Sequence, residues 1–353
     1  MSELTKFDHY LNDDGPAALV IREHLMPVEG SDGVLFPATF AAGDGFPGGY
    51  NINTFGDEKD GKNVCLIDSV GSQANRIEPL FMQAKYRHLV PQIVIKAGEH
   101  EVNILEAGHR AGDALVRCSS LQQSIDDAFS ASIRGDAAPL AKIAPTSLVF
   151  GVWNSRGDKG NQDKRPRLVA STIRAFDVRE LSRSAVYRAP VDYSLFDVFS
   201  EEDVQKAEGD AKNPLSKRGF VNALASNTHG GVIADGGVRR DSTLGLAALR
   251  HLHAADDKER TLVLRRYILG LSLVAFTAPT ESYLRQGCTL VRNPNQPREF
   301  VEVYPDGKRP PCEITHDAAL AFANVAAGAF GVGENRAVVF DKAKAKTDVK
   351  KND

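Results

Sequence analysis

Short apolar runs bounded by Gly, Pro, Asn and Asp recur along the chain and predict β-strands. One pair of runs flanks a glycine-containing turn, and another flanks the turn Asn293–Pro297, which indicates two hairpins. The runs that predict strands are 17–21, 63–68, 92–96, 101–105, 288–292 and 299–304.

Apolar residues at helical spacing predict helices between these strands. Ser120 has capping-box spacing before one helix, and Thr315 is a suitable N-cap for an Ala-rich helix closed by Gly331 and Gly333. The predicted helices begin after Ser69 and Ser120, cover about 242–252 and 258–274, and follow Thr315. Strands and helices mix without strict βα alternation, so the fold class is α+β.

The length of 353 residues predicts two lobes, or one domain with large insertions. Residues 30–63 are rich in Gly, Pro, Asn and Asp, which predicts a long irregular excursion. Residues 200–219 are polar and predict a surface loop or short helix. The Lys-rich tail 341–353 is poor in apolar residues, and we expect it to be disordered.

Net charge, cysteine pattern and the lack of targeting or ligand motifs narrow the classes of protein to which this sequence can belong. A net charge of −3 argues against indiscriminate coating with nucleic acid, although a local basic groove remains compatible with it. The four cysteines are scattered, which predicts reduced thiols. Neither a signal peptide nor a membrane-length apolar run is present, so we expect a cytoplasmic protein away from the membrane. Metal and cofactor motifs are absent, and we expect neither ligand.

A basic segment in the middle of the chain is the first candidate site. Two β-like runs, 148–153 and 167–174, flank a polar tip, and Gly151–Pro190 holds nine Lys or Arg against four Asp or Glu. A basic ribbon beside Trp153 suits a phosphate backbone and a stacked base. The alternative is a solvated β face with Trp153 in the core.

The turn from Asp68 to Arg76 is the second candidate. A strand that feeds a Gly/Ser turn at a helix start offers backbone N–H groups and hydroxyls to phosphate, and Gln73 and Asn75 could meet sugar or base edges. The alternative is an ordinary capped turn. The segment fits neither GxxxxGK[ST] nor GxGxxG, which disfavours a nucleoside triphosphatase or dinucleotide enzyme.

Two shorter basic pairs complete the pattern. Lys217-Arg218-Gly219-Phe220 begins like the aromatic RNA-contact motif of RRM domains but departs from it after Phe220. Arg239-Arg240 follows a Gly-rich stretch, 228–237, that we expect to be a loop, and the pair could meet phosphate or cap that loop.

Two blocks of the sequence resemble a known family. Ile67–Pro79 and Pro145–Gly157, the latter continuing through Lys164–Val169 to Ile173–Ala175, are similar to the CRISPR-associated RAMP superfamily, specifically the Cascade backbone subunit of subtype I-G. The likeness runs from roughly Cys65 to Gly333.

The resemblance implies a single hand-shaped domain over 1–340, with an RRM-like (ferredoxin-like) palm, finger insertions at about 30–63 and 151–170, and a thumb hairpin. It implies a non-catalytic subunit that stacks head to tail on CRISPR RNA and supports its pairing with a target DNA strand. Its partners would be further copies of itself, the large subunit and the repeat-processing subunit. The candidate RNA contacts are Ser69, Ser72, Gln73, Asn75, Arg76, Trp153, Ser155, Arg156, Lys164, Arg165, Arg167, Arg174, Lys217, Arg218, Arg239 and Arg240.

Two alternatives from other classes stay open. One is a metal-independent endoribonuclease that processes CRISPR repeat RNA with a histidine such as His229 as general base. The other is a small-molecule enzyme with a pocket around Gly230–Gly237, which depends on composition alone.

Overall fold

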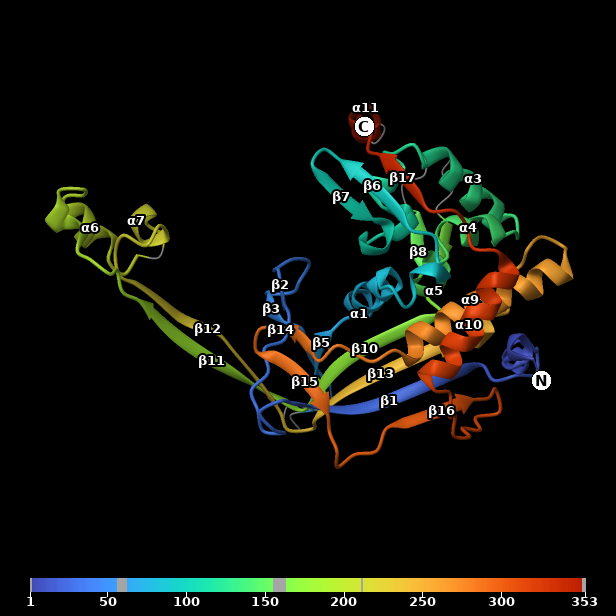
Figure 1. Ribbon diagram of the computed structural model, residues 1–353. Helices are drawn as coiled ribbons and strands as arrows, with labels where there is room; N and C mark the ends of the chain where they lie inside the picture. Colours follow the sequence, from blue (N-terminus) through green and yellow to red (C-terminus); the bar gives the residue numbers. More distant parts are fainter. Residues whose placement is uncertain (1, 56–61, 155–162, 211, 351–353) are drawn as a thin grey trace.

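The computed structural model describes residues 2–55, 62–154, 163–210 and 212–350. Figure 1 shows an α+β body from which one long arm projects. The helices are α1 (Val70–Ile77), α2 (Ala114–Arg117), α3 (Gln122–Ile133), α4 (Ala138–Ile143), α5 (Thr146–Phe150), α6 (Glu201–Ala207), α7 (Pro214–Lys217), α8 (Leu246–Leu249), α9 (Lys258–Thr277), α10 (His316–Phe330) and α11 (Lys342–Lys350). The 3₁₀ turns are η1 (Glu3–Thr5), η2 (Asp8–Leu11), η4 (Glu78–Met82), η5 (Arg87–Leu89), η6 (Ile104–Glu106), η7 (Arg110–Gly112) and η8 (Tyr193–Phe196).

The main sheet, which we call the palm, is antiparallel throughout. Its spatial order is β14 (Tyr283–Arg285), β15 (Cys288–Arg292), β1 (Ala18–Pro27), β13 (Val238–Gly245), β10 (Val169–Phe176), β5 (Asn63–Asp68) and β4 (Ile52–Thr54), with β16 (Glu299–Val303) also on β1. The inner strands, β15/β16–β1–β13–β10, have the 4-1-3-2 order of a ferredoxin-like fold when numbered along the chain. The α+β class is confirmed, and the palm is compatible with an RRM-like fold.

Helices cover one face of the palm, which we call the inner face; α1, α5 and α9 contact β10, and α9 also contacts β13 (Figure 1). Inward side chains of β1 alternate with outward ones, because successive residues of a strand point to opposite faces. The larger hydrophobic cluster joins Leu19, Ile21 and Leu244 to α9 and α10. A smaller cluster, which includes Leu25 and Ile173, lies toward the base of the arm.

The arm is an antiparallel ribbon of β11 (Val178–Tyr187) and β12 (Ala223–Ala234), and it carries η8, α6 and α7 at its tip (Figure 1). It leaves the palm between β10 and β13. Strands of ten and twelve residues give it a reach of about 30 Å. Aromatic rings pack at the tip, with the centroid of Phe220 at 5.1 Å from that of Tyr193 and 5.0 Å from that of Phe199.

Smaller sheets complete the fold. Strand β6 (Ile93–Ala97) pairs with β7 (His100–Asn103) and, in parallel, with β17 (Arg336–Val339). Two short pairs are β2 (Thr39–Phe40) with β3 (Gly49–Tyr50) and β8 (Val152–Asn154) with β9 (Asp163–Arg165). Within the described part of the chain, no helix combines the length and the apolar character that a membrane span requires.

Most predicted elements are confirmed, including the strands at 63–68 and 92–96 and the helices after Ser69, Ser120 and Thr315. The strand predicted at 101–105 ends at Asn103, because the chain turns into η6 at Ile104. The capping box predicted from Ser120 is wrong, since Leu121 is the N-cap of α3 and none of the described side chains caps that helix. The strand predicted at 148–153 is wrong over 148–150, which is the end of helix α5. All five residues of α5 are buried, so the apolar run has no period that distinguishes helix from strand.

The loop predicted at 228–237 is strand β12 as far as Ala234. Its glycines reflect close packing: a Cβ on Gly231, whose φ is +98°, would lie 2.5 Å from Val34 Cγ1 and 2.8 Å from the Leu35 carbonyl oxygen. The helix predicted at 242–252 shrinks to α8, because β13 continues to Gly245 between its partners β1 and β10.

The Lys-rich C-terminal tail contains a helix where we expected disorder. Residues 342–350 form α11, which is held by Arg117 Nη2 bonding Asp348 Oδ2 at 2.8 Å and by Lys344 Nζ bonding the Ser119 carbonyl at 3.0 Å. Composition could not anticipate these tertiary bonds. Residues 351–353 lie outside the described part.

Candidate nucleic-acid interface

The outer face of the palm, opposite the helices, presents cations from three adjacent strands. The register pairs His24 of β1 with Arg239 of β13, and Arg239 with Arg174 of β10. Directly paired residues share a face, so these three side chains form a row across the sheet. Arg22 and Asp241 form the next paired row toward the far end of the sheet.

Acidic residues compensate part of this charge. Asp241 Oδ1 lies 2.9 Å from Arg239 Nε and 3.4 Å from Arg22 Nε, and Glu299 Oε2 lies 3.6 Å from Arg22 Nη1. Arg174 has no ion-pair partner among the residues that the structure describes. The row therefore keeps an excess of positive charge, which suits a phosphate group.

An aromatic ring lies beside the row. The Arg239 guanidinium carbon is 4.7 Å from the centroid of Phe176, at the end of β10. Both side chains are half-buried, and a planar cation on a ring is a surface on which a nucleobase can stack. The outer face thus combines a free cation, a paired cation and a stacking ring on the two neighbouring strands β10 and β13.

The arm carries further charged and aromatic side chains. The Arg183 guanidinium carbon lies 5.5 Å from the Phe36 ring centroid. His229 Nδ1 is 3.7 Å from Glu180 Oε1, and its ring centroid is 4.8 Å from that of Tyr50. At the tip, Lys217 and Arg218 are exposed on and just after α7.

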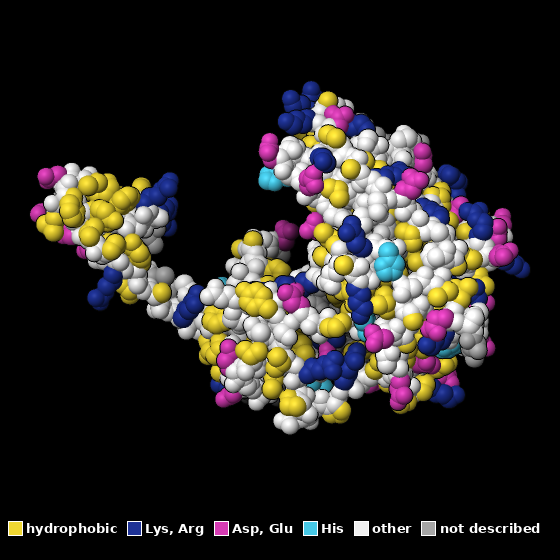
Figure 2. Space-filling model, viewed as in Figure 1, with side chains coloured by type: hydrophobic (Ala, Val, Ile, Leu, Met, Phe, Trp, Pro, Cys, Tyr) yellow, Lys and Arg dark blue, Asp and Glu magenta, His cyan; other side chains and the backbone are white. Residues whose placement is uncertain are grey.

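Figure 2 shows hydrophobic side chains gathered over the arm tip, with Lys and Arg to one side. Leu195, Phe196 and Val198 are 77, 63 and 54 % exposed. Apolar residues that protrude together from a projecting element commonly mark a surface that a protein partner covers.

The hairpin β8–β9 carries the predicted aromatic platform. Trp153 is 56 % exposed, which excludes the core interpretation, and Lys164 Nζ lies 5.9 Å from its ring centroid. Lys164 is exposed, and Arg165 lies in β9. Arg167 donates from Nε to the Phe150 carbonyl at 3.0 Å, and burial lowers its pKa. The predicted contacts Ser155 and Arg156 lie outside the described residues.

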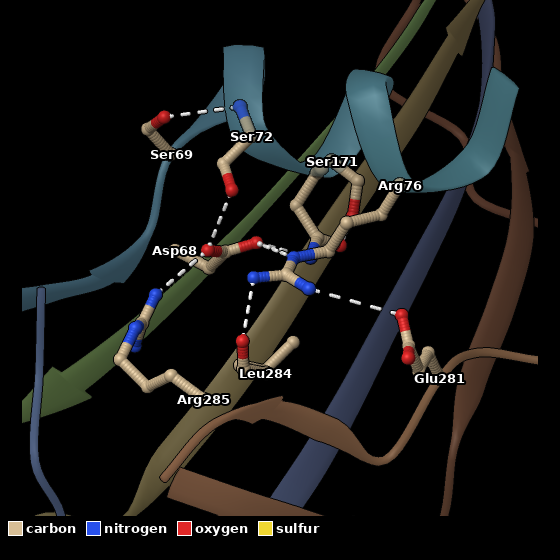
Figure 3. A network of polar contacts seen from close by, with 9 residues as sticks. Asp68, Ser69, Ser72, Arg76, Ser171, Glu281, Leu284 and Arg285 are labelled. Carbon is tan, nitrogen blue, oxygen red and sulfur yellow. Dashed lines mark hydrogen bonds and ion pairs between the residues drawn. The ribbon is translucent and has the colours of Figure 1, made fainter. Parts of the chain in front are cut away.

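The Asp68–Arg76 turn lies on the other side of the palm, and its polar side chains bond mainly to one another (Figure 3). The Ser69 hydroxyl caps α1 by accepting from the Ser72 amide at 3.2 Å. Buried Asp68 accepts from Ser72 Oγ at 2.8 Å and Gln73 Nε2 at 2.7 Å, and Arg76 Nε lies 3.3 Å from its Oδ2. Arg285 Nη2 completes the set at 3.0 Å.

These bonds fit the capped-turn alternative for Ser69, Ser72 and Gln73. RNA contact by the turn stays a prediction, and Asn75, which is exposed, and Arg76, which is partly exposed, are its accessible members. The turn and the outer face do not form one surface, because α1 covers the inner face.

Arg240 is likewise separated from Arg239. It is 5 % exposed on the inner face, where its Nη2 lies 2.7 Å from Glu23 Oε2, and burial lowers its pKa despite that carboxylate. Adjacent residues of a strand point to opposite faces, so only Arg239 of this basic pair reaches the outer surface.

The described residues contain no cluster of three or more His, Cys, Asp or Glu that could hold a metal. The cysteines are free and buried, and burial raises the pKa of Cys65 to about 12 and that of Cys288 to about 11. These groups are therefore neutral thiols rather than nucleophiles.

Sequence reasoning missed Arg22, His24 and Phe176 as candidate contacts. In 18–27 the polar residues Arg22, Glu23 and His24 are consecutive, so the sequence lacks the alternation that marks the outer face of a half-buried strand. The cross-strand row had no sequence signal either, because its members are distant in sequence.

The fold therefore defines an α+β protein with a ferredoxin-like palm and a projecting arm. Residues 19–180 match the family model described as CRISPR-associated protein GSU0053, from β1 to the start of β11. This match supports a CRISPR-associated protein. No curated protein matches the chain.

Proposed function

We propose that this chain is a non-catalytic CRISPR RNA-binding backbone subunit of a Cascade-type interference complex, of the RAMP superfamily and subtype I-G. Copies of the chain stack head to tail along the guide RNA and hold it for pairing with a target DNA strand. The observation that carries the proposal is the arm inserted between β10 and β13 of a ferredoxin-like palm, which corresponds to the thumb of a hand-shaped RAMP protein.

The outer face of the palm supports RNA binding of low sequence preference. Arg174, Arg239 and His24 provide cations and a ring-bearing side chain, and Phe176 provides a stacking surface. Such groups recognise phosphate and the π-face that every base has. The exposed Trp153 with Lys164 offers a second contact of the same kind.

The apolar arm tip supports head-to-tail assembly. Leu195 and Phe196 protrude from an element that leaves the body, so the surface that covers them belongs to another molecule. A contact between different surfaces of identical copies is heterologous and continues into a filament unless it is capped. Other subunits of the complex, the large subunit and the repeat-processing subunit, would provide those caps.

Size-exclusion chromatography with light scattering tests the proposal on the full chain mixed with CRISPR RNAs of three increasing lengths. We expect the mass to increase in steps with RNA length and a gel to show intact RNA. A one-to-one complex at every length, or shortened RNA, would contradict the proposal. A Leu195→Asp, Phe196→Asp variant should bind RNA without the stepwise growth.

The second candidate function is cleavage of repeat RNA, and the position of His229 beside Glu180 is the observation that favours it. A carboxylate beside an imidazole can orient it as a general base. Incubation of repeat RNA with the wild-type chain and with His229→Ala discriminates the two functions. Products that the wild type forms and the variant does not would establish the nuclease.

A further inference from the structure

Polar side chains cross the otherwise hydrophobic inner face of the palm in one continuous seam. Ser171 of β10 is paired with Ser242 of β13, and Arg240 of β13 is paired with Glu23 of β1. All four are buried. The seam separates the two hydrophobic clusters, and a buried polar set of this size is an informative departure from ordinary core packing.

The seam extends to α1 through direct hydrogen bonds. Ser242 Oγ donates to Ser171 Oγ at 2.9 Å, and Ser171 Oγ donates to Gln73 Oε1 at 3.0 Å. Gln73 Nε2 in turn donates to Asp68. Each residue in this series of hydrogen bonds is therefore held in a fixed orientation by the next.

A cavity of about 420 Å³ opens along the seam. Its floor is the inner face of the sheet, including Ser171, Ser242 and Arg240, and its roof is formed by α1, η4 and the end of α9. Leu25, Phe276 and Leu284 contribute apolar walls. The space between a sheet and the helices above it suits a flat ligand, and its volume lies in the range of small-molecule sites.

The charges around the cavity favour an anion. Arg76 and Glu281 lie at its mouth, Arg240 is in its floor, and Arg240 Nε is buried without a hydrogen-bond partner among the described residues. Two guanidinium groups, those of Arg76 and Arg240, line the cavity together with one carboxylate, that of Glu281. Their buried partners Asp68 and Glu23 are shared with arginines outside the lining, so Arg240 Nε and the partly exposed Arg76 remain available to an anionic group.

We propose that this cavity binds a small organic anion with a flat ring. The ring lies between the apolar walls and the seam hydroxyls, and the anionic group meets Arg76 at the mouth or Arg240 in the floor. Ser242 and Gln73 bond the polar edge of the ring. This site is separate from the RNA-binding surface of the outer face, because it lies on the opposite face of the palm.

Isothermal titration of the full chain tests the proposal with three probes: adenosine 5′-monophosphate, 4-hydroxybenzoate and inorganic phosphate. We expect at least one ring-bearing anion to bind saturably with a Kd below about 1 mM, and phosphate to bind at least about tenfold more weakly. Comparison of the first two probes distinguishes a nucleotide from an aromatic carboxylate.

Variants locate the binding. Ser242→Ala removes a floor hydroxyl and Arg76→Gln removes the mouth cation, and each should weaken binding about tenfold. Ser272→Ala is the matched control, because Ser272 is a buried serine of α9 outside the cavity lining. Arg174→Glu should weaken RNA binding and leave binding of the ring anion unchanged.

Three results would overturn the proposal: no saturable binding of either ring-bearing anion, phosphate binding as tight as theirs, or unchanged affinity in both Ser242→Ala and Arg76→Gln. None of these results bears on RNA binding by the outer face, so the two proposals fail separately.

Discussion

Removal of the Glu23 carboxylate should destabilise the palm strongly. Glu23 and Arg240 have side chains only 1 and 7 % exposed, and their charged atoms lie 2.7 Å apart. In Glu23→Gln the Arg240 guanidinium would stay buried without its counter-charge. Breaking a buried pair in this way costs about 3–5 kcal/mol, a large part of the free energy of unfolding of an ordinary domain.

The other two arginines contribute little to this cost. Arg292 and Arg298 also approach Glu23, but their side chains are 62 and 32 % exposed, so water can solvate them once the carboxylate is gone. The predicted loss therefore comes mainly from Arg240. A double variant, Glu23→Leu with Arg240→Met, removes both charges and should recover most of the stability, because apolar residues of similar size can replace a buried pair.

Urea unfolding followed by circular dichroism measures these differences through the transition midpoint. Glu202→Gln is a suitable control, because it breaks an exposed pair with Lys206 on α6 and should change stability by less than about 0.5 kcal/mol. The reasoning would be refuted if Glu23→Gln behaved like this control, or if the double variant were less stable than Glu23→Gln.

Three further predictions follow from other sites. Burial raises the pKa of Glu78 from 4.5 to about 7, against the opposing charge of Arg110. The folded state therefore binds the proton more tightly, so the stability of wild type relative to Glu78→Gln should fall by at most about 3 kcal/mol as pH rises from 4.5 to about 7, and then level off. A difference in urea stability that rose with pH would contradict this. Gly151→Ala should cost about 1–3 kcal/mol in the urea assay, because φ is +78° and the new Cβ would lie 2.7 Å from Arg167 Cγ; a urea midpoint equal to that of wild type would count against the strain. In fluorescence anisotropy, Arg174→Glu should weaken binding of every RNA sequence equally and reduce the slope of log K against log salt concentration by about 1. Arg134→Glu, an exposed residue on the helical side, should change neither quantity. Loss of binding for one sequence alone would indicate base readout instead.

The sequence predicts the elements of this fold well where local chemistry determines them. Ser69 and Thr315 cap their helices as expected, each accepting from a backbone amide at 3.2 Å. The arm could not be predicted in the same way. Strand β11 is exposed along nearly its whole length, so it lacks the alternation that identifies a half-buried strand.

The candidate site was predictable only in part. A basic, aromatic segment indicated Trp153, Lys164 and Arg174, and the first two lie together on a short hairpin. The proximity of Arg174 to Arg239 depends on the register of β10 with β13, which the sequence does not specify. The separation of Arg239 from Arg240 depends on which face of β13 the helices cover, and that too is a tertiary property.

The position of the arm also determines how freely its length can vary. Val178 and Ala234 are directly paired at its base, so the chain leaves and re-enters the palm at neighbouring points. Lengthening the ribbon by paired residues would add its own hydrogen bonds and leave the palm strands unmoved, because the entropy of closing the loop grows only slowly with its length. The distance between the palm surface and the arm tip can therefore change, in evolution or by design, while the palm strands stay the same.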